Sequence, residues 1–196
     1  MESKIIFNKL ETPRLLLRKI IETDIDIMYH LFSEHEIMRY TGVPLIKEKN
    51  EILAFINKNE AQYKNGEKIT WGIELKTTKK MIGYIGLFYI NNAHAYASLG
   101  ALLIKEYWNK GITTEAKKAI INFAFTKTFL NRIESQYYEK HIAIDKTNEK
   151  SGMKKEALLR ENFLMEGKFR NSIMCSIIKS DFQKNKDFYN FSKNYK

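Results

Sequence analysis

The residues with the clearest chemical potential form a short polar turn, Tyr107-Trp108-Asn109-Lys110-Gly111, between an apolar run and an amphipathic stretch. Gly111 has no Cβ, so the backbone can approach a ligand closely there. Asn109 is of the non-glycine type that best tolerates positive φ, and Lys110 adds a positive charge on a mobile side chain. We predict that this turn binds a phosphate or a pyrophosphate.

Two elements must position the turn. The apolar run that ends at Ile104 is typical of a strand. After the turn, apolar residues recur at spacings of three and four, which predicts one buried helix face made by Ile112, Ala116, Ala119, Ile120 and Phe123. The first N–H groups of a helix lack partners inside it, and the helix dipole adds partial positive charge, so the arrangement can bind an anion. Spacing alone leaves open an ordinary turn without a ligand. A Walker-type loop is excluded, because no Gly-Lys-Ser/Thr follows at the required distance.

The composition is typical of one globular domain that takes in residues 1–196. The chain is 44% hydrophobic and 13% aromatic, which suffices for a sizeable core. We expect this core over residues 10–181, with a tail after Asp181 that frays. The net charge of +10 favours a ligand with several phosphates. The lysines are dispersed, so charge alone is weak evidence for nucleic-acid binding.

A single cysteine, Cys175, excludes an internal disulfide framework and fits a reducing compartment. It lies in an apolar run, which favours a buried, unreactive thiol over a nucleophile. The sequence shows no signal-peptide pattern and no apolar run of bilayer length. We therefore expect a cytoplasmic protein that does not bind a membrane.

The predicted elements follow one another without a linker, repeat or low-complexity segment. A strand entered through Pro13 comes first, and Thr23 is the expected N-cap of the helix that follows. Three helical segments, three strands, a helix, a strand, a short helix and a final hairpin complete the order. The expected ranges are 10–18, 25–32, 34–40, 47–64, 69–76, 81–90, 96–104, 112–128, 132–140, 145–151, 153–163 and 168–179.

Three stretches, in order, resemble one family. The opening Glu-Thr-Pro-Arg-Leu-x-Leu-Arg, at residues 11–18, is the first, and residues 130–135 together with 149–160 are the third. The second is the polar turn and helix start, which keeps Tyr107, Trp108, Lys110, Gly111, Thr114, Glu115 and Ala116. The chain thereby resembles the GCN5-related N-acetyltransferases, in particular the branch that acetylates the N-termini of ribosomal proteins. The resemblance covers residues 10–181.

The resemblance implies an α+β fold with a central, twisted, mixed but mostly antiparallel sheet of about seven strands, flanked by helices. Strands 96–104 and 132–140 would diverge and hold the pantetheine arm of acetyl-CoA, the expected cosubstrate; no metal is implied. Lys146 and Lys150 are candidates for the 3′-phosphate, and His141 for the cofactor arm. The remaining expected contacts are Leu102, Leu103 and Ile104 through their backbone, and Trp108, Asn109, Lys110, Gly111, Ile112, Thr113 and Thr114 in the turn.

Several positions depart from the family pattern, mainly where catalysis is expected. Ser98 stands where a glutamate base is common, and Asn148 where many members have a tyrosine acid. His141 replaces an asparagine that binds the cofactor arm, and it could accept a proton near neutral pH or only donate a hydrogen bond. We take His141 and Ser98 as catalytic candidates, with His94 as a lesser one. The other departures are Asn109, Thr113 and Ile144.

We therefore expect an N-acetyltransferase that moves the acetyl group of acetyl-CoA to a primary amine. The expected acceptor is the N-terminal amine of a ribosomal or other protein. Three alternatives stay open: an antibiotic or small-amine acetyltransferase, a CoA-binding domain without catalysis, and an RNA-associated module. Polycationic antibiotics suit a protein of charge +10 poorly. Contact with nucleic acid is expected only through the ribosome, and the protein would act as a monomer or a homodimer.

Overall fold

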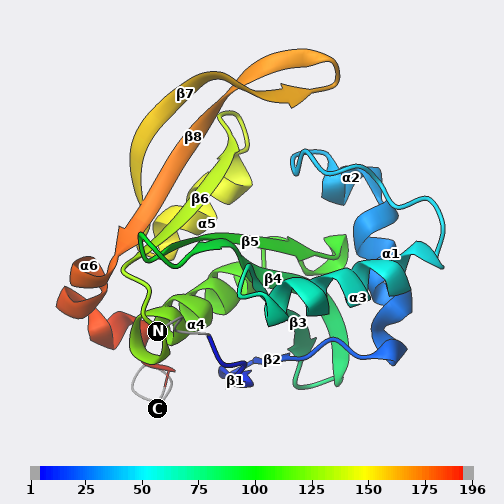
Figure 1. Ribbon diagram of the computed structural model, residues 1–196, viewed down its shortest axis with the longest axis horizontal. Coiled ribbons are helices and arrows are strands. Elements are labelled where there is room, and N and C mark those ends of the chain that lie inside the picture. Colours follow the sequence, from blue (N-terminus) through cyan, green and yellow to red (C-terminus); the bar gives the residue numbers. More distant parts are fainter. Residues whose placement is uncertain (1–4, 192–196) are drawn as a thin grey trace.

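The computed structural model describes residues 5–191, and its centre is one eight-stranded sheet (Figure 1). Neighbouring strands are antiparallel except for β5 and β6, which are parallel. In sheet order the strands are β1 (Leu10–Glu11), β2 (Leu15–Arg18), β3 (Ile69–Leu75), β4 (Lys80–Asn91), β5 (Tyr96–Leu103), β6 (Arg132–Tyr138), β8 (Lys168–Ile178) and β7 (Lys154–Met165). The α+β fold with a mixed, mostly antiparallel sheet is thus confirmed.

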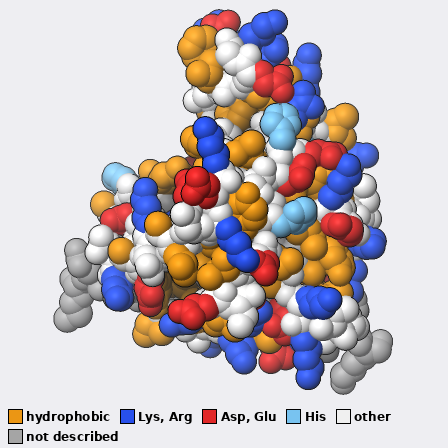
Figure 2. Space-filling view, turned by 90° about the vertical axis from the view of Figure 1, so that its right-hand side faces the viewer, with side chains coloured by type: hydrophobic (Ala, Val, Ile, Leu, Met, Phe, Trp, Pro, Cys, Tyr) orange, Lys and Arg blue, Asp and Glu red, His pale blue; other side chains and the backbone are white. Residues whose placement is uncertain are grey.

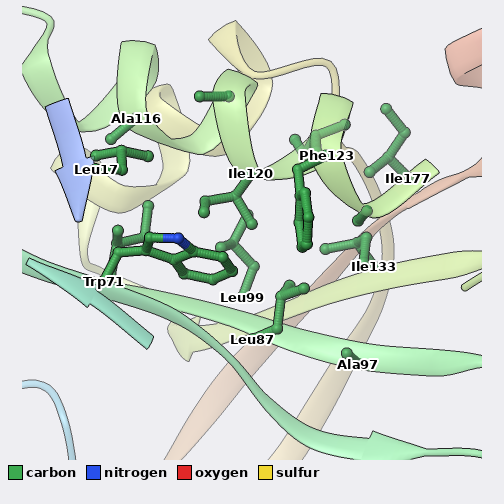
Figure 3. Close-up of a cluster of buried hydrophobic side chains, with 14 of the residues drawn as sticks. Leu17, Trp71, Leu87, Ala97, Leu99, Ala116, Ile120, Phe123, Ile133 and Ile177 are labelled. Carbon is green, nitrogen blue, oxygen red and sulfur yellow. The ribbon is translucent and has the colours of Figure 1, made fainter. Parts of the chain in front are cut away.

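Helices cover both faces of the sheet. The helices are α1 (Ile25–Ser33), α2 (His35–Met38), α3 (Glu51–Lys64), α4 (Ile112–Lys127), α5 (Ile142–Lys150) and α6 (Lys179–Lys184), with short 3₁₀ turns at Glu22–Asp24, Lys105–Tyr107 and Lys186–Tyr189. The apolar face of α4 packs on one side of the sheet, where Ile120 and Phe123 meet Trp71 of β3 (Figure 3). A second cluster, which includes Met28 of α1 and Tyr84 of β4, fills the opposite side.

The feature that positions the site is the short pairing between β5 and β6. Only residues 96–98 of β5 pair with residues 132–134 of β6. Beyond Ser98 and Glu134 the two strands diverge, while β5 continues along β4 and β6 along β8. The sheet therefore opens in its middle, as the resemblance implied.

The predicted first strand is in fact two strands, which explains why the sheet has eight strands and not about seven. The Thr12 hydroxyl accepts from Leu15 N–H at 2.9 Å, and this turn separates β1 from β2. A second difference concerns the expected N-cap. Thr23 lies inside the 3₁₀ turn Glu22–Asp24, where the Asp24 carboxylate accepts from Ile21 N–H at 2.8 Å, and Asp24 occupies the N-cap position of α1. Both differences come from side-chain hydrogen bonds to the backbone, which compete with regular secondary structure.

Other boundaries differ by a few residues. The helix expected from residue 47 begins at Glu51, because the Glu51 carboxylate accepts from the N–H groups of Lys47 and Glu48 and holds them outside the helix. The short helix expected from residue 145 begins already at Ile142.

The tail expected to fray after Asp181 includes the end of α6 and the turn Lys186–Tyr189, and it packs on the core up to Phe191. Tyr189 is 2% exposed, and its hydroxyl donates to Ser151 O at 3.0 Å. Gly152 leaves room for this ring, since a Cβ there would lie 2.1 Å from the Tyr189 hydroxyl oxygen. Helix α6 and the turn Lys186–Tyr189 thus form part of the core. Along residues 5–191, no helix combines the length and apolarity needed to cross a bilayer.

Candidate active site at the opening between β5 and β6

The turn before α4 has the conformation that the sequence predicts. Asn109 and Gly111 both have positive φ, of 58° and 72°. Helix α4 starts at Ile112, and its first hydrogen bond runs from Glu115 N–H to Gly111 O at 3.1 Å. The N–H groups of residues 112–114 therefore precede the helical ladder and lie at the positive end of the helix dipole. This is the geometry of an anion site.

Two residues that sequence reasoning did not assign to the site hold this turn in place. The buried Glu115 carboxylate accepts from the Thr12 hydroxyl at 2.5 Å, from Arg14 N–H at 3.0 Å and from Arg14 Nε at 2.6 Å. Arg14 also donates to Lys110 O at 2.8 Å, which brings a fixed cation to the turn. The signal was present in the motifs, since Arg14 and Glu115 lie in two of the matching stretches.

The predicted contacts in the turn divide into backbone and side-chain roles. The Trp108 indole N–H donates to Leu103 O at 2.7 Å, so this ring anchors the turn to β5. The Ile112 side chain is buried in the core, so this residue can contact a ligand only through its backbone amide. Thr113 and Thr114 are half-buried, and Lys110 is exposed with its ammonium over the Tyr107 ring.

A cationic hollow of about 530 Å³ adjoins the turn. It is lined by Arg14, Gly111, Thr114, Glu115, Lys118, Phe188 and Phe191. Lys146 and Lys150, the residues expected at the 3′-phosphate, are exposed on α5 and do not line this hollow. Arg14 and Lys118 are thus two further cations beside the turn that the sequence did not single out.

The N–H groups of β5 that face the opening are not all those expected. Ile104 N–H donates to Ile82 O at 3.0 Å, so it is bonded to β4 and not to the opening. Because hydrogen-bonded and non-hydrogen-bonded pairs alternate in an antiparallel ladder, the N–H groups of Leu103 and Ala101 point toward the opening, and that of Leu102 does not. The sequence had assigned this role to residues 102–104 and had not included Ala101.

Ser98 lies at the apex of the opening, in the last residue pair between β5 and β6. Its partner Glu134 presents a carboxylate on the same face, an acid–base group that sequence reasoning missed. Glu134 accepts from Arg132 Nε at 2.6 Å, and the same guanidinium binds Glu156. Ser98 is therefore next to a carboxylate that is already paired.

His141 lies at the start of α5, and its ring contacts a segment far away in sequence. The centroids of the His141 and Tyr40 rings are 4.3 Å apart, and Tyr40 also stacks on Tyr138 of β6 at 5.9 Å. Burial, together with the positive charge of Lys117, lowers the pKa of His141 below its usual 6.5. The imidazole is thus neutral at pH 7 and able to accept a proton. By contrast, His94 is exposed in the β4–β5 turn.

Above this ring cluster, two remote segments touch and form what we call the arch. Arg39 Nε, just after α2, donates to Glu166 Oε1 at 3.2 Å in the β7–β8 turn. The Phe163 ring of β7 lies beside Gly42. The β7–β8 hairpin rises well beyond the rest of the sheet (Figure 1), and it stands above the α1–α3 side in Figure 2. On that side, acidic and basic side chains intermingle without a large area of one sign (Figure 2).

A model of the acetyltransferase (GNAT) domain matches residues 14–154. This match spans both strands of the opening, the turn and α5, and covers more than half of the chain. The chain belongs to the GNAT acetyltransferase family. Among curated proteins, the uncharacterized N-acetyltransferase YoaA of Bacillus subtilis is 30% identical over 174 residues, which are 89% of this chain and 98% of that protein.

Other GNAT proteins resemble the chain in sequence or in fold. The spermidine N(1)-acetyltransferase of Escherichia coli is 25% identical over 85% of this chain and 87% of its own. A spermidine N-acetyltransferase from Vibrio cholerae, solved with CoA and spermine, superposes with a TM-score of 0.78 at 21% identity, covering 87% and 98% of the two chains. RimL, a ribosomal L7/L12 α-N-protein acetyltransferase solved with CoA, gives 0.78 at 14% identity, covering 87% and 98%.

Membership of the GNAT family makes this chain an N-acetyltransferase that uses acetyl-CoA and an amine acceptor. The resemblance seen in the three sequence stretches is therefore confirmed for the family. It is not confirmed for the ribosomal branch, because relatives named for spermidine and for a ribosomal protein both occur among the matches.

Proposed function

We propose that this protein acetylates the α-amine of a protein N-terminus, in the cytoplasm, with acetyl-CoA bound along the opening between β5 and β6. The proposal rests on one observation: the anion site before α4 and the open edge of β5 adjoin each other. The amides before α4 suit a diphosphate, and the open edge of β5 begins directly beside that turn. A pantetheine arm would pair with this edge as an added strand does.

The chemistry needs a neutral amine, because an ammonium has no lone pair to attack the acetyl carbonyl. In the proposed mechanism His141 takes up the proton that the amine loses, since its imidazole is neutral at pH 7. The N–H groups of Ala101 and Leu103 are the donors available for the oxyanion of the tetrahedral intermediate. Ser98 would then contribute a hydroxyl for hydrogen bonding and not a base.

The surroundings of His141 favour an acceptor that is a flexible chain end. The arch spans the acceptor side, so a narrow, extended substrate can enter beneath it more easily than a rigid, bulky one. Three of the five carboxylates in the segment 20–40 pair with cations outside it: Asp24 with Arg18, Asp26 with Lys49 and Glu36 with Lys105. The charge of this segment therefore does not select among amine acceptors.

A polyamine such as spermidine is the second candidate acceptor. One observation favours it: the names of relatives that match over most of the chain. A polyamine is also narrow enough to pass beneath the arch. The overall charge of +10 counts against a polycation. We therefore place it after the protein N-terminus.

The test is an acetyl-transfer assay with the purified protein and labelled acetyl-CoA. Peptides that begin with Ala or Ser are compared with the same peptides blocked at the α-amine and with spermidine. Label in the free peptides alone supports the proposal, and label in spermidine alone replaces it with the second candidate. CoA binding without transfer to any amine would favour a domain that has lost catalysis, and salt-dependent RNA binding without turnover would favour an RNA-associated module.

A further inference from the structure

A lysine without a carboxylate partner is buried where α4 packs against α5. Lys117 is 3% exposed, and its ammonium nitrogen donates to Asn148 Oδ1 at 2.5 Å. The Asn148 amide in turn donates to Ser135 Oγ at 3.2 Å. Among the ion pairs of the described residues, none involves Lys117. A buried charge normally has a partner of opposite sign, so this cation calls for an explanation.

The groups around Lys117 do not supply that partner. Cys175 of β8 is protonated, because burial raises the pKa of its thiol. The Asp145 carboxylate of α5 is occupied by the Tyr137 hydroxyl at 2.7 Å and by Lys155 at 2.8 Å. His141, at the start of α5, has a neutral imidazole at pH 7 and supplies no negative charge.

Desolvation therefore dominates at Lys117. It lowers the pKa of the side chain from 10.5 to about 8. The ammonium holds its proton at neutral pH but releases it easily, which is the property of a general acid that works near pH 7.

The position of the cluster connects this charge to the reaction. Ser135 is the first residue of β6 after the last pair with β5, so the chain Lys117–Asn148–Ser135 reaches the apex of the opening. Helices α4 and α5 meet on this side (Figure 1). The arm of the CoA thioester proposed for the opening would bring its sulfur atom to the same place. His141 lies on the acceptor side, against Tyr40.

We propose that Lys117 is the proton donor for the CoA thiolate that leaves in the acetyl-transfer step. The amine nitrogen forms a bond to the acetyl carbon, and the C–S bond breaks with its electron pair on sulfur. The Lys117 ammonium gives its proton to that sulfur, which yields CoA thiol and a neutral lysine. Solvent restores the proton after the thiol departs. Asn148, an amide without an acidic proton, positions the ammonium.

This inference rests on the proposed placement of CoA in the opening but not on the identity of the acceptor amine. Its test therefore uses CoA alone. The pKa of the CoA thiol is measured by the ultraviolet absorbance of the thiolate, free and bound, in the wild type and in Lys117→Met. Lys127→Met is the matched control: it removes the same charge from an exposed position of the same helix, at the end of α4 away from the turn.

The nearby ammonium should lower the thiol pKa in the wild-type complex by about one unit or more. This shift should disappear in Lys117→Met and persist in Lys127→Met, with CoA still bound by all three proteins. With acetyl-CoA and an accepted amine, kcat at neutral pH should fall about 100-fold in Lys117→Met, while KM for acetyl-CoA changes little. Equal thiol pKa values in the wild type and Lys117→Met, or an unchanged kcat, would overturn the proposal.

A second variant distinguishes the loss of a proton donor from a general loss of packing. Asn148→Asp places a carboxylate on Lys117, which should raise the pKa of that lysine. The alkaline limb of the kcat profile should then move to higher pH, although the side-chain volume is nearly unchanged. An alkaline limb at the wild-type position in this variant would show that Lys117 is not the acid.

Discussion

The side of the opening that we propose for CoA, which we call the CoA side, is built from residues 103–115. The Trp108 indole N–H donates to Leu103 O there, and the Glu115 carboxylate accepts from Thr12 and Arg14. The acceptor side is assembled from segments that are distant in sequence. There Tyr40, Tyr138 and His141 touch through their rings, and the arch depends on an exposed ion pair between Arg39 and Glu166. We expect the first to be the more rigid, because its Glu115 anchor is buried, whereas the second is held by ring contacts and an exposed ion pair. A family can keep such a CoA site while its acceptors change.

The largest effect should follow from Gly111→Asp. A carboxylate at the turn would repel the diphosphate, and a side chain at φ 72° is strained. We expect the affinity for CoA, measured by calorimetry, to fall about 1,000-fold, or ~4 kcal/mol. Gly167→Asp is the matched control, because Gly167 has the same φ and nothing within 4 Å of its Cβ position. Equal losses of CoA affinity in the two variants would contradict the anion site.

Glu115→Ala tests the attachment of the turn to the N-terminal strands. The change leaves the Thr12 hydroxyl and the Arg14 guanidinium without their buried partner. The free energy of unfolding, from urea titration, should fall by ~3 kcal/mol. Glu115→Gln retains one acceptor oxygen and should lose less. If both variants were as stable as the wild type, the CoA side would not be the rigid side of the comparison.

Lys117→Met should stabilise the protein, by an amount that depends on pH. The folded protein releases the Lys117 proton near pH 8, whereas the unfolded chain keeps it up to about pH 10.5. Between these values the unfolded state binds more protons, so wild-type stability rises with pH relative to the variant. The gap should be up to ~3 kcal/mol at pH 7 and should close by pH 11. Urea titrations at both pH values measure it, and a gap independent of pH would contradict the buried charge.

His141→Asn separates the two roles open to this residue. Asparagine retains a hydrogen bond to the cofactor arm but cannot act as a base. If His141 is the base, kcat should fall about 10-fold or more, and the acid limb of the pH–rate profile should disappear. In the wild type that limb should lie below pH 6.5, since burial and Lys117 both lower the His141 pKa. A variant that retained the limb with full kcat would assign His141 to the cofactor arm.

Arg39→Ala should have the smallest effect. Both partners of its ion pair with Glu166 are about half exposed, so the free energy of unfolding should change by less than ~1 kcal/mol. KM for the acceptor should change a few-fold, while the affinity for CoA stays constant. The control Lys76→Ala breaks a similar surface pair with Glu11, away from the arch. A loss of CoA affinity in Arg39→Ala but not in Lys76→Ala would contradict the separation of the acceptor side from the CoA side.

The sequence predicted the backbone of the turn before α4 well, because local backbone rules govern it. Asn109 and Gly111 indicate positive φ, and the apolar spacing after Gly111 indicates the start of α4. The contacts of Glu115 with Thr12 and Arg14 span about 100 residues of chain, and no local pattern indicates them. The same holds for Lys117, which the helical spacing placed outside the buried face although α5 covers it. Tyr40 could not be placed beside His141 for the same reason.

The three-residue contact between β5 and β6 also has a mechanical consequence. Within residues 5–191 it is the sole strand pairing between β1–β5 on one side and β6–β8 on the other. The core beneath α4 also joins the two blocks, but the N–H groups of Ala101 and Leu103 face the gap between them. A molecule that bridges this gap would add hydrogen bonds between the blocks. Amide exchange along Ala101 and Leu103 would slow when the gap is bridged.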